Sequence, residues 1–380
     1  MTEAFDSPRT LAVRFTGSGS EYFRIWIVNL LLIVVTLGFY LPFAKVRRLR
    51  YFYGNTVVDD QPLAFHGQPW AMFRGHVLLL VLFGLYAVAG QVSPVAALVA
   101  FVILAAIWPA LWRAGLAFRL ANTSWRGLRF AFRGDLAGAY AALAPMGLGL
   151  ALMLAGPVWL GTPNELEPTK VGSGVVAVFV GMAIMMLTLP WVLARIKRYQ
   201  HDHYAWAGEQ TRFAAGPGAF YGWALKLLGM ATLAMVALGG AVAGVVFGGG
   251  QDAKGPWLIY GPVVLIFVFY GVMGLLLYPW GITRLQNLVW NATTSDQLRF
   301  DSRLALGATV RLHAVNVVLT LLTLGLYRPF AAVAMARLRL EAVTVQAQTD
   351  PATWQVGAGT AGADAAGEAA GDFFGFDLGL

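Results

Sequence analysis

Side chains that could do chemistry are sparse in this sequence, and His201-Asp202-His203 is the one place where they form a local cluster. Alternate residues of an extended segment lie on one face, so both imidazoles would point to the same side and could share a metal ion. A third ligand does not follow nearby. We therefore favour a polar loop at the membrane surface for this tripeptide, and we predict neither a metal site nor a cofactor.

Catalytic patterns do not emerge from the sequence. It has no cysteine, which excludes thiol chemistry, disulfides and cysteine-ligated metals. A glycine-rich phosphate loop, a nucleophile elbow and paired carboxylates are all missing. The 19 acidic residues fall outside the six most apolar segments, so the usual mid-membrane carboxylate for coupling transport to protons or sodium is missing too. The sequence leans against an enzyme and offers no catalytic residues.

Two small groups of polar side chains form the candidate site. Asn29, Thr36, Asn316 and Thr323 lie within apolar stretches and could line a pore or a substrate path. Such groups more often hydrogen-bond one helix to another, at about 1 kcal/mol or less each, and we prefer that interpretation. The second group is basic and consists of candidate contacts for lipid or a protein partner: Lys45, Arg47, Arg48 and Arg50.

Composition determines the elements that carry these residues. Of 380 residues, 58% are hydrophobic and 12% are charged, about half the charge of a soluble domain, so lipid is the solvent for most of the chain. A helix needs about 20 apolar residues to cross about 30 Å of hydrocarbon. Six segments qualify as transmembrane helices: 76–92, 95–112, 138–160, 173–193, 219–247 and 257–280.

Basic residues gather in every second connection between these segments. The stretches 45–75, 113–137, 194–217 and 281–307 hold 17 of the 27 Lys and Arg residues. By the positive-inside rule these stretches face the cytoplasm. Topology therefore explains the net charge of +8, and we predict a multi-pass protein of the cytoplasmic membrane with no nucleic-acid partner.

One apolar segment occurs twice. Residues 24–50 align without a gap with residues 311–337. The alignment brings Asn29 opposite Asn316, and it brings Thr36-Leu37-Gly38 opposite Thr323-Leu324-Gly325. Composition bias does not produce such a match, so the chain contains internal repeats.

The cytoplasmic loops share one design. A proline and an aromatic residue mark the helix exit, and a polar turn and a short Arg-Phe or Ala-Phe segment follow. Stretches such as 55–67 and 122–134 carry turn residues between two short extended runs, which is typical of β-hairpins. We expect short cytoplasmic hairpins that pair into a small shared sheet, because pairing would hide their edges.

These motifs resemble a known family. GSGSEYFRIWIVN, TLGFYLPFAKVRRLRYFYGNT and LAFHG, in that order, resemble the YjgN family of bacterial inner-membrane proteins, a domain of unknown function, over residues 13 to about 345. The resemblance implies a bacterial inner-membrane location and several spans, and it brings no catalytic residues. The second repeat departs from the first, because Ala332-Val333-Ala334-Met335 replaces Lys45-Val46-Arg47-Arg48 and puts any role of the basic cluster in doubt there.

The two repeated segments leave the span count open. Residues 23–44 and 312–336 each lie between a strand and a helix exit where the other units have two apolar helices. If each crosses once, the fold is an all-α bundle of about eight transmembrane helices, which we slightly prefer. If each turns back at its Thr-Leu-Gly, six spans and two re-entrant segments result. Re-entry would require these breaks to pack inside the bundle, because exposed irregular backbone is not tolerated in lipid.

Domain boundaries follow from composition. We expect a flexible stretch over residues 1–12, a repeated transmembrane domain over 13–345, and a disordered tail over 346–380 that is rich in Ala, Gly and acid. The tail ends in Phe373, Phe374 and Phe376 among acidic residues. It could dock on a partner or on the protein's own basic face, although an unconstrained tail is our default interpretation.

Three functional hypotheses remain from the sequence, and the third, a membrane enzyme, would need a cluster of titratable groups that does not emerge. The first is a transporter or channel for a small solute or a lipid, built on the repeated bundle. The second is a membrane scaffold or envelope-organising protein whose basic cytoplasmic face binds anionic lipid or a protein partner. Membrane lipids are the expected partners in the first two cases, together with a protein partner or self-association.

Overall fold

The computed structural model describes residues 4–160, 168–248 and 257–349. Within these ranges the chain repeats one pattern five times: a strand, a helix that leaves the sheet, a helix that returns, and a strand. We call each repeat a unit and its pair of helices a hairpin. Unit 1 consists of β1 (Ala4–Phe15), α1 (Gly19–Val35), α2 (Leu41–Gly54) and β2 (Thr56–Val58).

The other units follow in chain order. Unit 2 consists of β3 (Gln61–Phe65), α3 (Pro69–Val92), α4 (Pro94–Ala121) and β4 (Thr123–Trp125). Unit 3 consists of β5 (Leu128–Phe132), a broken helix α5 (Leu136–Leu143) and α6 (Pro145–Leu160), then α7 (Pro168–His201) and β6 (Tyr204–Trp206). Unit 4 consists of β7 (Glu209–Gln210), β8 (Arg212–Phe213), α8 (Pro217–Gly248), α9 (Trp257–Asn291) and β9 (Thr293–Thr294). Unit 5 consists of β10 (Leu298–Ser302), α10 (Leu306–Leu322), α11 (Arg328–Glu341) and β11 (Val343–Thr349).

All strands pair antiparallel in one sheet that closes on itself. Its order is β7-β6-β5-β4-β3-β2-β1-β11-β10-β9-β8. The two ends of this order, β7 and β8, are separated along the chain by Thr211 alone, whose backbone N–H donates to the Tyr204 carbonyl. The segment 209–213 thus pairs with β6 through β7 and with β9 through β8, so the order of strands returns to its start and forms a ring.

The register of the sheet places every hairpin at the same edge. In each unit the last residue of the incoming strand lies opposite the first residue of the outgoing strand. We call this edge the helical rim. The five opposed pairs are Phe15 and Thr56, Phe65 and Thr123, Phe132 and Tyr204, Phe213 and Thr293, and Ser302 and Val343.

Tight turns close the opposite edge. Asp59-Asp60, Arg126-Gly127 and Ala207-Gly208 all have positive φ angles, which two-residue hairpin turns of type I′ require. No loop is needed between units 5 and 1, because β11 pairs directly with β1. The strands nearest the two chain ends thus close the ring.

Apolar side chains fill the inside of the ring. Leu11, Trp125, Trp206 and Val345 come from four different strands and belong to one buried cluster. The rings of Trp125 and Trp206 lie 4.7 Å apart, and their indole N–H groups donate to the carbonyls of Val58 and Leu128. The sheet is therefore a packed core for the platform from which the helices leave.

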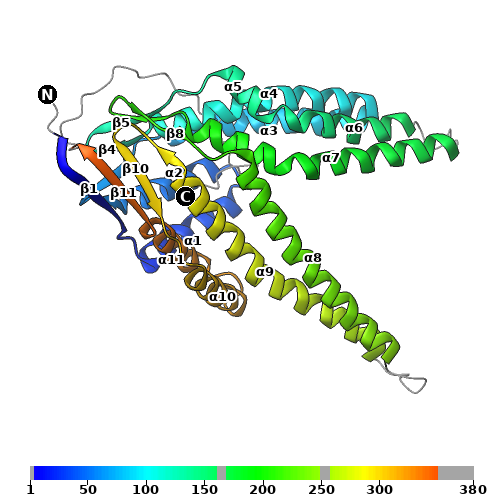
Figure 1. Ribbon diagram of the computed structural model, residues 1–380. Coiled ribbons are helices and arrows are strands. Elements are labelled where there is room, and N and C mark those ends of the chain that lie inside the picture. The colour runs from blue at the N-terminus through cyan, green and yellow to red at the C-terminus, as the bar shows by residue number, and fades with distance from the viewer. Residues whose placement is uncertain (1–3, 161–167, 249–256, 350–380) are drawn as a thin grey trace.

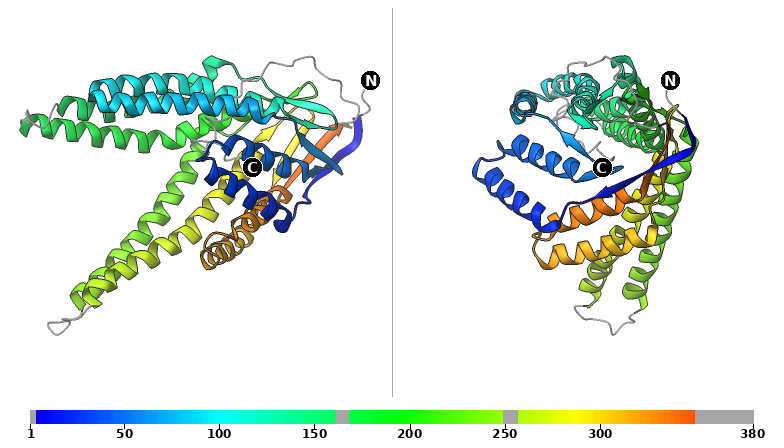
Figure 2. Two further views of the ribbon diagram at one scale, coloured as in Figure 1. Left: turned by 180° about the vertical axis from the view of Figure 1, so that it is seen from behind. Right: turned by 90° about the vertical axis from the view of Figure 1, so that its left-hand side faces the viewer.

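The long helices diverge from the platform in two arms. Figures 1 and 2 show α3, α4, α6 and α7 running together in one direction and α8 and α9 in another. Among the described residues, five helices are long and apolar enough to cross a membrane, or six if α5 and α6, bent by 54°, form one span. The prediction of a predominantly helical, polytopic membrane protein is confirmed at this level.

The two matching segments, 23–44 and 312–336, do not form continuous helices. We call the helix pairs α1–α2 and α10–α11, which contain them, the twin hairpins. α1 ends at Val35 and α2 begins at Leu41, and α10 and α11 are separated in the same way by residues 323–327. Each pair leaves and re-enters the sheet at the helical rim. Within the described part of the chain, neither 23–44 nor 312–336 holds a helix of spanning length, so the preferred eight-span arrangement finds no support in these helices.

Both boundaries of the repeated domain differ from the expected ones. β1 begins at Ala4, within the stretch expected to be flexible, and β11 continues to Thr349, within the stretch expected to belong to the tail. The physical reason is mutual pairing, which short segments of ordinary composition do not reveal when their partner lies more than 300 residues away. Residues 350–380 lie outside the described residues.

Candidate functional site

The turn of each twin hairpin is built around a threonine. The Thr36 hydroxyl donates to the Leu32 carbonyl and accepts from the Tyr40 backbone N–H, at 2.7 and 3.0 Å. The Thr323 hydroxyl makes the corresponding bonds, to the Leu319 carbonyl and from the Tyr327 backbone N–H, at 2.6 and 2.9 Å. Both threonines of the expected pathway therefore serve as helix caps at a chain reversal.

The turns satisfy their own backbone donors. From Thr36 to Leu41, every backbone N–H donates to an oxygen of the same hairpin, and residues 323–328 repeat the pattern bond for bond. Gly38 and Gly325 have φ angles of 92° and 93°, a conformation that side chains disfavour. This explains why the Thr-Leu-Gly sequence occurs in both copies.

The tips of the twin hairpins are apolar and uncovered. Leu37 and Leu324 are 89% and 94% exposed. The expectation that a re-entrant break must pack inside the bundle is therefore wrong for these turns. A break is costly in lipid only when its polar groups are unpaired, and here the donors are paired locally.

The two buried asparagines tie the helices of each hairpin together. The Asn29 side-chain amide donates to the Ala44 carbonyl at 3.5 Å, and Asn316 donates to the Ala331 carbonyl at 3.4 Å. Arg47 donates to the amide oxygen of Asn29 at 3.4 Å. Its counterpart in the repeat is Ala334, and within residues 4–160, 168–248 and 257–349 the buried amide oxygen of Asn316 has no hydrogen-bond partner.

Side chains on several returning helices donate hydrogen bonds to backbone carbonyls at the point where a hairpin leaves the sheet. Arg50 donates to the Gly67 carbonyl, Arg113 to the Gly134 carbonyl and Arg337 to the Gly17 carbonyl. Asn287 holds the Leu304 carbonyl in the same way. Arg47 and Arg50 of the expected basic cluster thus make internal contacts, while Lys45 is half-buried on α2.

Arg48 remains directed to the surface and has a counterpart on a neighbouring unit. Arg48 on α2 and Arg328 on α11 are both exposed, and both lie near enough to Tyr22 for their charges to act on its hydroxyl. Neither forms an ion pair with an acidic residue of the described ranges. We call these two arginines the seam pair, because units 1 and 5 meet there.

Sequence reasoning missed the Phe-x-Gly motif at the helical rim. A Cβ on Gly17, Gly67 or Gly134 would lie within 2.8 Å of the ring of the phenylalanine two residues earlier. The glycine lets the chain turn against that ring as it enters the next helix. Phe-x-Gly also occurs elsewhere in the printed sequence, so the signal that could have revealed it is its recurrence at the same place in three units, directly after the incoming strand.

A tyrosine fixes the entrance to α1. The Tyr51 hydroxyl donates to the Ser18 carbonyl at 2.7 Å and accepts from the Ser18 backbone N–H at 2.8 Å. Burial raises the pKa of Tyr51 above its ordinary value, which keeps the hydroxyl protonated for the donated bond.

The His201-Asp202-His203 cluster is divided among structural contacts. His201 is buried against the Thr293 hydroxyl, Asp202 accepts from the Phe213 backbone N–H, and His203 bonds the Tyr199 carbonyl. Among the residues searched in the described ranges, no group of three or more His, Asp or Glu side chains is placed to hold a metal ion.

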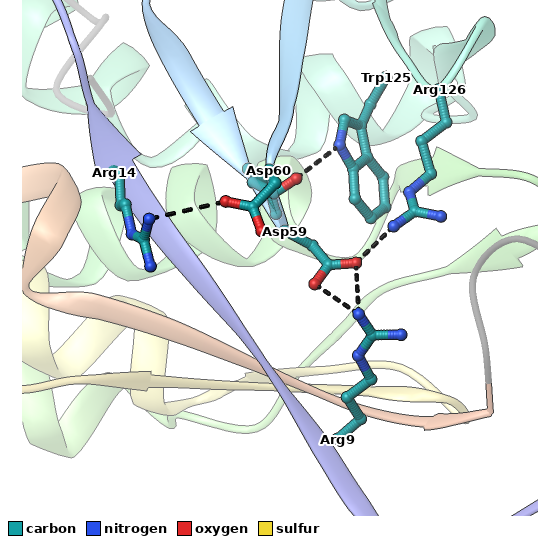
Figure 3. Close-up of polar contacts among 7 residues, drawn as sticks. Arg9, Arg14, Asp59, Asp60, Trp125 and Arg126 are labelled. Atoms are coloured by element: carbon teal, nitrogen blue, oxygen red, sulfur yellow. Dashed lines mark hydrogen bonds and ion pairs between the residues drawn. The ribbon is translucent and has the colours of Figure 1, made fainter.

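A cluster of ion pairs joins β1 to two β-turns at the edge of the sheet opposite the helices. Figure 3 shows the Asp59 carboxylate between Arg9 and Arg126, with Arg14 directed to Asp60. Arg9 and Asp59 approach to 2.9 Å. Because these residues come from β1 and from two β-turns between strands, the cluster stabilises the position of the N-terminal strand.

Polar side chains also gather on the inner side of the returning helices. Lys197 and Gln200 of α7 and Thr283 of α9 are 4%, 4% and 2% exposed. Gln286 of α9 exchanges two hydrogen bonds with Arg339 of α11, at 2.7 and 2.9 Å. We call these five residues the inward polar face.

Long apolar helices carried on a closed sheet define the class: a polytopic membrane protein with a β-sheet platform. The chain matches the family described as "Bacterial protein of unknown function (DUF898)" over residues 10–373, and it belongs to that family. The resemblance drawn from the Thr-Leu-Gly-x-Tyr-x-Pro-Phe repeats is thereby confirmed.

Named relatives agree with this assignment. The chain is 36% identical over 123 residues to inner membrane protein YjgN of Salmonella typhimurium, covering 31% of this chain and 30% of that protein. It is 29% identical over 177 residues to inner membrane protein YjgN of Escherichia coli K12, covering 45% and 43%. Each alignment thus spans less than half of the relative's length. No solved structure matches the chain.

Proposed function

We propose that the protein is an inner-membrane scaffold that binds anionic lipid headgroups where the turn of the unit 5 hairpin meets the hairpin of unit 1. The observation that carries the proposal is the seam pair, in which Arg48 and Arg328 come from different units and both remain exposed near Tyr22. Two exposed guanidinium groups around the same tyrosine would attract an anionic phosphodiester headgroup.

The twin hairpins support this interpretation. Their turns satisfy their own donors and expose Leu37 and Leu324, so they can stand in lipid without a surrounding protein shell. α1 has 17 residues and is about 25 Å long, shorter than the hydrocarbon core. We propose six spans and two re-entrant hairpins, with the sheet on the cytoplasmic side where the positive-inside rule puts the basic loops.

A lipid-facing role also fits the surfaces of the long helices. No residue is buried in the most apolar 18-residue stretch of α8, and 6% of the corresponding stretch of α9 is buried. The four polar residues of the expected pathway act as caps and hairpin ties, as described above. These contacts favour a scaffold standing in lipid over a path lined by those side chains.

Lipid preference of the purified protein tests the proposal. Phosphatidylglycerol added to the protein in neutral detergent should raise its unfolding temperature more than phosphatidylcholine does. The variant Arg48→Glu/Arg328→Glu should lose this difference, since two basic residues contribute about 1 kcal/mol each, or about thirtyfold in affinity together. The control Arg129→Glu/Arg299→Glu changes two exposed arginines on the strands and should keep the difference. Equal shifts by the two lipids in the parent protein would refute the scaffold proposal.

Transport of an anionic solute is the second candidate, and the inward polar face favours it. Lys197 is buried there beside Gln200, whose amide oxygen has no hydrogen-bond partner in the described part of the chain. Reconstituted vesicles that take up a labelled organic anion, with uptake lost in Lys197→Met, would support transport over the scaffold. Vesicles that show no uptake above protein-free controls would exclude it for that anion.

A further inference from the structure

The inner side of the helix ring is polar and basic, and the packing of α7 identifies it. Val192, Ile196 and Tyr199 pack against α4 and α5, while Ala194 packs against α8 and α9. Arg198 is exposed on the outer side. Lys197 and Gln200, one turn apart, therefore lie on the remaining side, which faces the middle of the ring.

The next returning helices present the same side. Leu285 and Val289 of α9 pack towards α7 and α8, and Asn287 reaches the entrance of unit 5. On the surface of α9, Gln286 lies between the side that packs towards α7 and α8 and the side that reaches unit 5. It accepts a hydrogen bond from Arg339 of α11. Arg339 stands ten residues after the helix-exit proline Pro329, the spacing that separates Gln200 from Pro190 and Arg119 from Pro109. The equivalent spacing puts Arg119 of α4 on this side too.

Two buried polar atoms on this side have unused hydrogen-bonding capacity. The amide oxygen of Gln200 and the hydroxyl of Thr283 are buried and have no hydrogen-bond partner among the residues that the structure describes. A buried polar group without a partner costs about 1–3 kcal/mol, so such groups are kept where something else bonds them. Arg119, Lys197 and Arg339 add positive charge, which specifies an anion.

We infer that the inward polar face is the docking surface for the protein's own C-terminal segment, residues 350–380. That segment has five acidic residues, Asp350, Asp364, Glu368, Asp372 and Asp377, and no Lys or Arg. Its three phenylalanines, at 373, 374 and 376, suit contact with helices of apolar composition. Charge and hydrophobicity of the segment thus complement the face.

Length and tethering make the chain's own tail a better occupant than a free ligand. The segment follows Thr349 at the end of β11, and 31 residues can extend about 100 Å. Returning along a seven-residue strand uses about 24 Å of that reach. A tethered segment is present at an effective concentration on the order of millimolar, which favours it over dilute partners.

Cysteine cross-linking in the full-length protein tests this inference, because the chain has no native cysteine. Phe374→Cys is combined with Gln200→Cys or Thr283→Cys on the inward face, and with Arg198→Cys on the outer side of the same helix as the matched control. A short bismaleimide should join the inward pairs on the order of tenfold more efficiently than the control pair. Neutralising the tail with Asp364→Asn, Glu368→Gln, Asp372→Asn and Asp377→Asn should remove most of that excess.

The outcomes separate the tail from other occupants. Equal yields for inward and outer pairs, or inward yields that survive neutralisation, would overturn the inference. Cysteines at 200 and 283 that phosphatidylglycerol protects from maleimide, and that become no more reactive when residues 350–380 are deleted, would assign the face to lipid. The lipid test of the seam pair uses other residues and another readout, so either proposal can fail alone.

Discussion

Arg337 on the last helix donates to the carbonyl of Gly17 at the start of the first hairpin, at 2.8 Å, although 320 residues separate them along the chain. The same guanidinium reaches the Phe15 carbonyl at 3.3 Å. Together with the β1–β11 pairing, this contact joins unit 5 to unit 1 and makes the five units a ring.

Removing the Arg337 side chain should weaken ring closure. Arg337→Ala loses two charge-assisted hydrogen bonds, and we expect the free energy of unfolding to fall by about 1.5–3 kcal/mol. Denaturant titration in detergent measures the change, and Arg337→Lys should recover part of it. Arg299→Ala, an exposed arginine on β10, is the control. Equal stability of both alanine variants would contradict the role given to this contact.

A methyl group at the rim glycines should destabilise the fold. The added Cβ of Gly67→Ala would lie 2.5 Å from the Phe65 ring, and we expect a loss of about 1–3 kcal/mol from overpacking. Trimming the ring with Phe65→Leu should restore part of the stability in the double variant. Gly84→Ala, where nothing lies within 4 Å of the new Cβ, should be neutral or slightly stabilising. Thermal unfolding in detergent compares them, and a rim variant as stable as Gly84→Ala would refute the clash.

Replacing a capping threonine should destabilise its turn more than replacing a neighbouring threonine does. Thr36→Val and Thr323→Val each leave a backbone N–H without its acceptor, which costs about 1–3 kcal/mol in an apolar setting. Hydrogen exchange of the turn amides should accelerate in both variants. Thr320→Val is the control, because its hydroxyl bonds no group in the described ranges. Unchanged exchange at Tyr40 and Tyr327 would show that the hydroxyls do not hold the turns.

Restoring the missing arginine should stabilise the second hairpin. In Ala334→Arg the new guanidinium can donate to the unpaired amide oxygen of Asn316, as Arg47 does for Asn29. We expect a gain of about 1 kcal/mol, since a hydrogen bond replaces an unsatisfied buried acceptor. Combination with Asn316→Leu should abolish the gain. A gain that persists without Asn316 would mean that the arginine acts through another contact.

How much of this could be predicted from the sequence differs between levels. Apolar composition predicted a polytopic protein, and the alignment of Thr36-Leu37-Gly38 with Thr323-Leu324-Gly325 predicted twin segments, which the structure builds with matching bonds. The alternatives for those segments stayed open because 22 apolar residues satisfy both a span and a hairpin. The turns at Gly38 and Gly325, where φ is positive, depend on local hydrogen bonds that apolar counts do not describe.

The closed ring was harder to foresee. β11 and β1 pair across more than 300 residues, and short strands such as β7, of two residues, carry almost no periodic signal. Likewise, polarity alone made Asn29 a pathway candidate, while its bond to Ala44 depends on how two helices of one hairpin meet. The inward face needed the packing of α7 on both neighbours before Lys197 could be given a direction.

The side of the membrane on which the sheet lies tests the account most directly. An impermeant maleimide can label single cysteines in oriented vesicles. Three of the positions lie in the turns between strands, Asp60, Gly127 and Asp296, and two lie on the closing strands, Ser7 and Thr349. A ring whose hairpins all leave one rim predicts that all five positions react from the same side, the cytoplasmic one. Labelling of Ser7 or Thr349 from the side opposite to the three turns would contradict the ring and restore single crossings at the twin segments.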